Sequence, residues 1–188
     1  MQPSLLHRIQ FHNDETAFRQ FYTDHMFRLF QFAFTFIQNR EQAEEIVNDV
    51  FLRLWQNRSR IDQIENISVY LYVAVKNTAA NYQRQVNRRD SGDLEVAHHF
   101  YLSPDPEQLL ITDELRKKIA AAIDGLPARC KLIFKLVKED GLSAAEVAAI
   151  LDISYKTVTT QLTIALKKLE EALRPSLPKN FSASFKKK

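Results

Sequence analysis

The stretch Gly141–Leu173 reads GLSAAEVAAILDISYKTVTTQLTIALKKLEEAL, and it decides the fold of the second half of the chain. Ser143 and Glu146 have the spacing of a capping box, in which each side chain bonds the backbone amide of the other residue at a helix start. Asp152-Ile153-Ser154 then ends this short helix, and its serine can cap a second one. The pattern predicts a helix-turn-helix, whose second helix can enter the DNA major groove.

The second helix of this stretch has one apolar and one polar face. Residues three and four positions apart share a face of a helix. On the apolar face these are Val158, Leu162, Ala165, Leu169 and Ala172. On the opposite face they are Lys156, Thr160, Thr163 and Lys167. A helical hairpin that only packs together would have the same apolar face, so the pattern alone leaves both interpretations open.

The composition of the whole chain indicates an all-α protein with one domain or two small ones. Of its 188 residues 45% are hydrophobic, and 3 Gly and 6 Pro leave few turns of the kind that join strands. The net charge of +3 permits nucleic-acid binding without indicating it. The single Cys130 excludes an intramolecular disulfide and a Cys-rich zinc site. We see no signal peptide and no apolar run of about 20 residues, so we expect a cytoplasmic chain without stable membrane insertion. We also expect no metal or other cofactor.

The first third of the chain is dense in phenylalanine, which predicts a helix over 17–38 that is buried on more than one side. Residues 1–14 are short and mixed. A second helix is predicted over Glu41–Gln56, with a polar and acidic face, and a third over about 68–85. In the third helix tyrosines alternate with amides and cations. That mixture suits single-stranded nucleic acid, although the rings can equally belong to a core.

Residues 86–106 interrupt the helical pattern with prolines and polar residues, and they predict a linker. We therefore expect domains over 1–85 and 107–175, followed by a loose basic tail over 176–188. The second domain opens with predicted helices over Glu107–Ile123 and Ala128–Glu139. The adjacent His98 and His99 lie in the linker, and no third ligand at a useful spacing makes a metal site of them.

Several short motifs follow one another in a definite order along the chain. Residues 43–55 read AEEIVNDVFLRLW and residues 70–77 read YLYVAVKN. The second domain adds Leu126-Pro127, Gly141-Leu142-Ser143, Glu146-Val147-Ala148 and Thr157-Val158. Together they resemble the extracytoplasmic-function (ECF) group of bacterial sigma-70-type factors over most of the chain. The first motif resembles region 2.2, the second regions 2.3 to 2.4, and the set in the second domain region 4.

The resemblance implies that the first domain binds core RNA polymerase and captures the melted −10 promoter element. The residues that match the surface that docks on the β′ clamp are Glu45, Asn48, Asp49, Phe51 and Trp55. The candidate −10 contacts are Lys76, Asn77, Asn81 and Arg84. Tyr70, Tyr72 and Tyr82 can stack on bases, with Tyr70 the one we assign to the core.

The same resemblance implies that the second domain contacts the β flap and reads the −35 element as duplex DNA. The exposed candidates are Tyr155, Lys156, Thr159, Thr160, Gln161 and Thr163. Gln161 can pair with adenine and threonine methyls can touch thymine. Relatives often carry arginine where this helix has threonines, so we expect weak promoter binding by the isolated chain. The family also implies an anti-sigma factor that occludes both surfaces.

Two other functions stay open at this point. A free-standing helix-turn-helix regulator would account for the second domain but not for the motifs at 43–55 and 70–77. A small helical enzyme would use Cys130 as nucleophile with His98 or His99 as base. Cys130 has apolar neighbours on a predicted helix, where an unreactive core thiol is expected, so we predict no catalysis.

Overall fold

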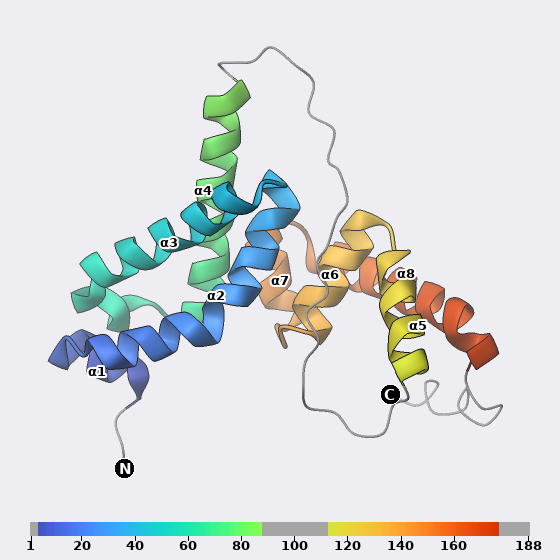
Figure 1. Ribbon diagram of the computed structural model, residues 1–188, viewed down its shortest axis with the longest axis horizontal. Helices are drawn as coiled ribbons and strands as arrows, with labels where there is room; N and C mark the ends of the chain where they lie inside the picture. Colours follow the sequence, from blue (N-terminus) through green and yellow to red (C-terminus); the bar gives the residue numbers. More distant parts are fainter. Residues whose placement is uncertain (1–3, 88–112, 177–188) are drawn as a thin grey trace. The chain divides into compact units, whose positions relative to one another are not determined.

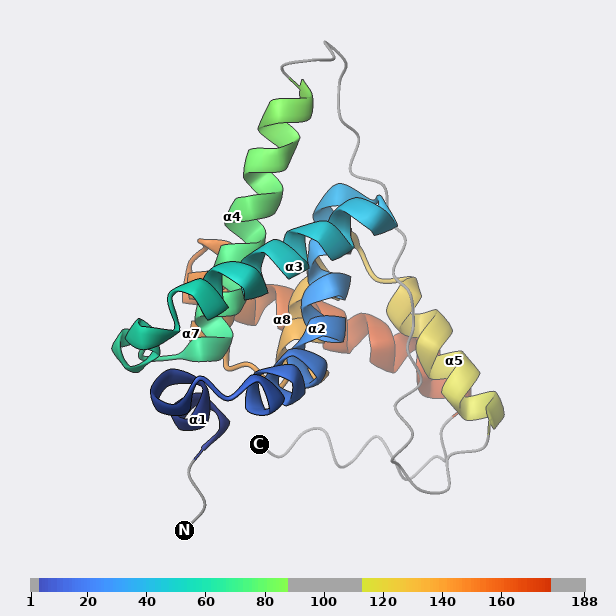
Figure 2. The ribbon, with the colours of Figure 1, turned by 60° about the vertical axis from the view of Figure 1, so that its left-hand side comes forward.

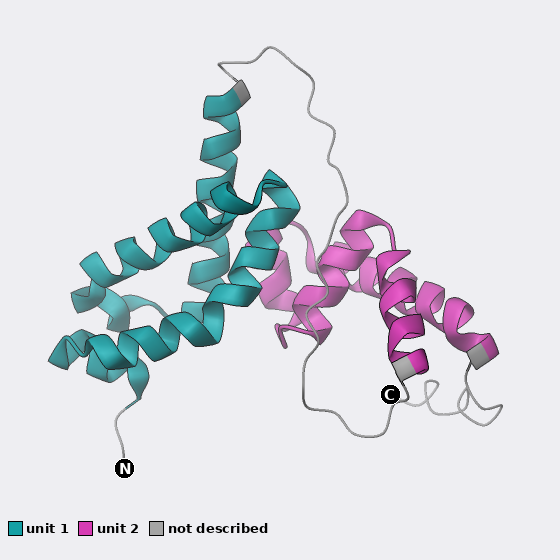
Figure 3. Ribbon diagram, viewed as in Figure 1, with its two compact units in different colours: residues 1–101 teal, residues 102–188 magenta. Residues whose placement is uncertain are grey.

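The computed structural model describes residues 4–87 and 113–176, and these residues form helices with no strand among them (Figure 1). The prediction of an all-α fold is confirmed. The chain divides into two compact units, Met1–Tyr101 and Leu102–Lys188 (Figure 3). Most of the predicted linker and the tail lie outside the described residues, as do His98 and His99.

Unit 1 is built from three long helices and two short elements. In chain order they are α1 (Leu5–His12), α2 (Glu15–Ile37), α3 (Arg40–Gln56), the 3₁₀ helix η1 (Arg58–Gln63) and α4 (Ile67–Asn87). The helices α2, α3 and α4 all pack on one another, and α1 packs on α2 and η1. Figure 2 shows α3 in front of both α2 and α4. The two helices that carry most candidate contacts of unit 1 therefore share one core.

Aromatic rings fill that core, which explains the phenylalanine-rich first third. Phe51 of α3 is buried, and the rings of Phe18, Phe21 and Tyr22 from α2 lie 6.2, 6.2 and 4.8 Å from its centroid. The interplanar angles of 61–79° are those of edge-to-face pairs, which aromatic quadrupoles favour. These contacts fix α3 along α2.

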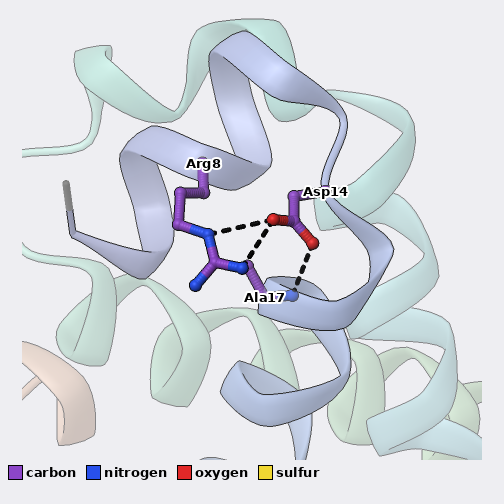
Figure 4. Close-up of polar contacts among 3 residues, drawn as sticks. All are labelled: Arg8, Asp14 and Ala17. Carbon is purple, nitrogen blue, oxygen red and sulfur yellow. Dashed lines mark hydrogen bonds and ion pairs between the residues drawn. The ribbon is translucent and has the colours of Figure 1, made fainter. Parts of the chain in front are cut away.

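The helix α1 precedes the first helix that the sequence analysis predicted. Ser4 caps it, and Asn13 ends it in the left-handed conformation with φ 50°. Asp14 then caps α2 by accepting a bond of 3.0 Å from the Ala17 amide (Figure 4). The same carboxylate accepts bonds of 2.9 and 2.6 Å from the Arg8 guanidinium. An eight-residue helix is marginal by itself, so these tertiary bonds stabilise it.

Unit 2 surrounds its last long helix with three shorter ones. The three shorter helices are α5 (Asp113–Asp124), α6 (Ala128–Lys138) and α7 (Ala144–Leu151). The long helix is α8 (Tyr155–Leu173), and the 3₁₀ turn η2 (Arg174–Ser176) follows it. The helices α5, α6 and α7 each pack against α8. One core cluster joins Ile123, Leu126, Cys130, Ala165 and Leu169. The predicted first helix of this unit began at Glu107, and its residues before Asp113 lie outside the described part.

Candidate protein and nucleic-acid interfaces

The junction of α7 and α8 has the local geometry that the sequence predicts. The Ser143 amide donates to Glu146 Oε2 at 2.7 Å, and the Glu146 amide donates to Ser143 Oγ at 3.2 Å. Asp152 ends α7 in the left-handed conformation with φ 56°. Ser154 Oγ then accepts the Thr157 amide at 3.0 Å and caps α8. The predicted helix-turn-helix and both of its caps are confirmed.

The outward surface of α8 carries Lys156, Thr160 and Thr163, which we call the α8 face; all three are exposed, as is the neighbouring Tyr155. Thr159 is half-buried. The hydroxyl of Thr159 donates to the Lys156 carbonyl at 3.0 Å, and that of Thr163 to the Thr159 carbonyl at 2.8 Å. With their hydroxyl protons used within the helix, these threonines present methyl groups and hydroxyl acceptors to a partner.

Gln161 does not belong to the exposed surface, contrary to the sequence prediction. It is half-buried, and its Oε1 accepts a bond of 2.9 Å from the thiol of Cys130 on α6. Position 161 lies three residues after Val158 and four before Ala165, both of which are buried, so it borders the apolar face. Its carbonyl oxygen is therefore turned towards α6.

The thiol of Cys130 is the group that a catalytic hypothesis requires. Cys130 is a free cysteine and is buried, and burial raises the pKa of its thiol, with the Lys168 charge opposing that shift. A raised pKa leaves less of the nucleophilic thiolate near neutral pH. The environment therefore matches that of an unreactive core cysteine.

The predicted −10 contacts line one side of α4. Asn77, Asn81 and Arg84 are exposed, and Lys76 is half-buried beside them. Arg84 Nη1 donates to Asn81 Oδ1 at 2.9 Å, which holds the guanidinium against the helix. Gln83 Nε2 donates to the Phe36 carbonyl of α2 at 2.6 Å. This bond anchors the last turns of α4 while Asn81 and Arg84 face outwards.

The three tyrosines of α4 differ in how far they can meet a base. Tyr72 is 5% exposed, and its ring packs edge-to-face on Phe32 at 5.0 Å, so the prediction that it can stack on bases is wrong. Tyr70 was assigned to the core, but it is 38% exposed. Tyr82 is half-buried. Tyr72 precedes Val75 and Ala79 at spacings of three and seven, and both of those residues are buried.

The exposed side of α3 carries Glu45, Asn48, Asp49 and Leu52, which we call the α3 face. Leu52 is 54% exposed and was missed by the sequence analysis. It lies seven, four and three residues after the other three, so all four share one side of the helix. That spacing is the signal that could have identified it, since the apolar positions around it face the other way.

Of the two aromatic residues that the sequence analysis placed on this surface, Phe51 is buried in unit 1 and Trp55 is half-buried. Phe51 is 2% exposed, which contradicts its predicted contact with polymerase. Trp55 is half-buried, with the Phe18 ring 4.8 Å from its centroid and the Arg58 guanidinium 4.4 Å from it. These neighbours cover part of the Trp55 ring.

The part of the chain that the structure describes contains no cluster of metal-ligand side chains and no candidate membrane-spanning helix. Within 4–87 and 113–176, no three His, Cys, Asp or Glu side chains come together as metal ligands would. No helix in these ranges has the length and apolarity to cross a bilayer.

Models of two protein families match the chain in sequence. The model of sigma-70 region 2 matches residues 21–89 and that of sigma-70 region 4 matches residues 116–169. The first range contains the candidate residues of α3 and α4, and the second those of α8.

Curated proteins with similar sequences match most of the chain. An ECF RNA polymerase sigma-E factor of Escherichia coli K12 is 24% identical over an alignment of 180 residues. The alignment covers 91% of this chain and 93% of that protein. An RNA polymerase sigma-H factor of Pseudomonas aeruginosa is 21% identical over an alignment of 182 residues, which covers 92% of this chain and 94% of that protein.

Two solved structures have a similar fold. CnrH, in complex with the cytosolic domain of CnrY, is 19% identical with a TM-score of 0.53 and covers 92% of this chain and 97% of its own. The sigma factor RpoE of Bartonella quintana, in complex with the anti-sigma factor NepR, is 21% identical with a TM-score of 0.54 and covers 84% of this chain and 96% of its own.

Proposed function

This chain belongs to the ECF group of the sigma-70 family, and from that membership we propose that its units divide the work of promoter-specific initiation. As a sigma factor it binds core RNA polymerase and directs transcription from promoters with −10 and −35 elements. The observation that carries the proposal is the presence of regions 2 and 4, in that order. Region 2 has exposed candidate residues on α3 and on α4, and region 4 has them on α8.

The α3 face is proposed to dock on the β′ clamp. Asn48 and Asp49 offer an amide and a carboxylate to a partner helix, and Leu52 between them adds an apolar contact in place of the buried Phe51. The Asp49 carboxylate lies 3.9 Å from Arg53, a loose exposed pair that is easily exchanged for a partner cation. An arginine-rich partner surface would suit this arrangement.

The outward side of α4 is proposed to hold the opened −10 strand. Lys76 and Arg84 can meet phosphates, Asn77 and Asn81 can bond base edges, and the exposed Tyr70 can stack. Extruding a base costs a few kcal/mol, which stacking of about 1–3 kcal/mol per base offsets. Polymerase supplies the chemistry, so the chain itself has no catalytic role.

The α8 face is proposed to read the −35 duplex while unit 2 contacts the β flap. Lys156 can meet phosphate or guanine, and the threonine methyls can touch thymine. The half-buried Gln161 can pair bidentately with adenine only if its Oε1 is released from the Cys130 thiol. The α8 face has one lysine, so few phosphate contacts are available and the isolated chain is expected to bind promoters weakly. Weak binding is sufficient if the polymerase holds both units on the DNA.

The domain limits, location and regulation complete the proposal. Residues 1–85 and 107–175 would form the two domains, with 86–106 linking them. The chain would act in the cytoplasm, where its promoters are. CnrY and NepR are the partners in the two similar structures, and an anti-sigma factor that covers the α3 and α8 faces is proposed for this chain as well.

Run-off transcription with core RNA polymerase on genomic fragments tests the proposed function. The expected result is a set of transcripts that start at fixed positions only when the chain is added. A chain that leaves core polymerase without promoter selectivity on every fragment contradicts the proposal. Tight promoter binding by the chain alone would instead indicate a free-standing regulator.

A further inference from the structure

One polar side chain of the α3 face is held by a residue of another helix. The hydroxyl of Tyr22, on α2, donates to Oδ1 of Asn48, on α3, at 2.8 Å. The two residues are 26 positions apart, so the bond depends on the packing of α2 against α3. It connects the proposed docking surface on α3 to α2, a helix to which no contact with polymerase or DNA has been assigned.

The Tyr22 ring is half-buried and packs against the aromatic core of unit 1, which restricts its movement. Its centroid lies 4.8 Å from that of Phe51, at 61°. Phe51 is itself buried and also contacts the rings of Phe18 and Phe21. A tyrosine has two side-chain torsions before its hydroxyl, so a fixed ring places that hydroxyl at a defined point on the surface.

The bond determines which half of the Asn48 amide a partner meets. An asparagine side chain has a carbonyl acceptor and an NH₂ group with two donors. With Oδ1 engaged by Tyr22, the NH₂ group of this exposed side chain is left to donate outwards. The neighbouring Asp49 carboxylate accepts. The α3 face thus presents a fixed donor beside an acceptor.

We infer that Tyr22 is a positioning residue for polymerase binding, which acts by fixing Asn48 before the partner arrives. This inference rests on the proposed function of the α3 face. Ordering a mobile side chain on binding lowers affinity, and removing that cost in advance raises it. For one side chain the typical cost corresponds to a change in Kd of about two- to tenfold.

A binding cycle with full-length variants and core RNA polymerase tests the inference. Tyr22→Phe removes the hydroxyl and keeps the ring on Phe51. We expect Tyr22→Phe to raise Kd about two- to tenfold and Asn48→Ala to raise it at least as much. In the Asn48→Ala background, Tyr22→Phe should have no further effect, since the side chain that it positions is gone.

The matched control is Thr35→Val, which removes another hydroxyl from α2. Thr35 Oγ1 donates only to the nearby Phe32 carbonyl among the bonds described, and the variant should bind polymerase like the wild type. Thermal unfolding of every variant shows whether the fold is retained.

The outcomes separate this inference from the proposed function. Wild-type affinity in Tyr22→Phe, or an equal loss in both Asn48 backgrounds, overturns the positioning role and leaves the proposed function intact. A wild-type chain that fails to bind core polymerase overturns both.

Discussion

The α3 face and the α8 face are held in place by different kinds of bond. On α3, Asn48 is fixed by Tyr22 of α2, and the helix is positioned by a cluster of rings from α2. On α8, the hydroxyls of Thr159 and Thr163 bond carbonyls of their own helix, and Ser154 caps its first turn. The α3 face depends on tertiary packing, whereas the geometry of the α8 face is set mainly by local sequence.

The largest expected effect is on the free energy of unfolding, and it should differ sharply between the neighbouring residues Phe51 and Leu52 of α3. Phe51→Ala should lower the free energy of unfolding of unit 1 by about 3–5 kcal/mol, because it leaves a cavity among the rings. Leu52→Asn should change it by less than about 0.5 kcal/mol, since Leu52 is largely exposed. Chemical denaturation measures both, and similar losses in the two variants would contradict the assignment of inner and outer sides.

Leu52→Asn should instead weaken the binding of core polymerase. Side chains whose truncation costs more than about 1 kcal/mol of binding free energy lie near the centre of an interface, which is where the α3 face would place Leu52. The control is Phe27→Asn, which removes an exposed apolar side chain of α2 that has no proposed contact. A binding assay in which Leu52→Asn and Phe27→Asn both match the wild type would remove Leu52 from the docking surface.

In unit 2 a purely local change should have an effect of intermediate size. Ser143→Ala removes one half of the capping box of α7 and should cost about 1 kcal/mol of folding free energy. Ser143→Asp keeps a capping oxygen and should recover most of that loss. Thermal melting of the three proteins decides the point, and an Asp variant no more stable than the Ala variant would mean that the cap contributes little.

A smaller effect is expected on the α8 face, where it should appear in DNA binding alone. Lys156→Ala should weaken promoter binding by the polymerase complex and reduce its slope against log salt by about 1. Polymerase binding should stay unchanged. Lys138→Ala, at another exposed lysine of unit 2, serves as the control. Equal salt slopes in wild type and Lys156→Ala would exclude a phosphate contact.

The smallest effect concerns the bond between α1 and α2. The Ala17 amide and the Arg8 guanidinium lower the pKa of Asp14 below its usual 3.8. A lowered pKa stabilises the fold above the ordinary pKa of the group, and this contribution disappears as the pH falls through the lower, folded value. Asn caps helices as well as Asp does, so Asp14→Asn isolates the charge. The stability difference between the two proteins should shrink below about pH 4; a constant difference would contradict the assignment.

The contrast between the two faces also explains what sequence could predict. The caps of α7 and α8 and the outward position of Lys156, Thr160 and Thr163 follow from residues three and four apart, so pattern alone was sufficient. The assignments that failed depend on partners far away in sequence. Phe51 and Trp55 were placed on the surface because their ring neighbours in α2 could not be known. The helix α1 was missed because it packs on the distant η1, where the Ser59 carbonyl accepts a bond of 3.1 Å from Gln10.

Leu52 could have been identified from its spacing with Glu45, Asn48 and Asp49, whereas the orientation of Gln161 could not. Gln161 lies at the boundary between the apolar and polar positions of α8. The bond from Cys130 on α6, 31 residues away, turns the side-chain oxygen of Gln161 inwards. A polar residue at such a boundary can adopt either orientation, and only the neighbouring helix decides between them.

The division of labour between the two faces is tested most directly by one paired measurement. Core polymerase binding and promoter-selective run-off transcription are measured for Asn48→Ala/Asp49→Ala and for Lys156→Ala/Thr160→Ala, with folding checked by circular dichroism. We predict that the α3 variant loses polymerase binding and therefore transcription, while the α8 variant binds polymerase like the wild type and loses transcription from promoters that need a −35 element. Polymerase binding that survives in the α3 variant, or is lost equally in both, would contradict this account.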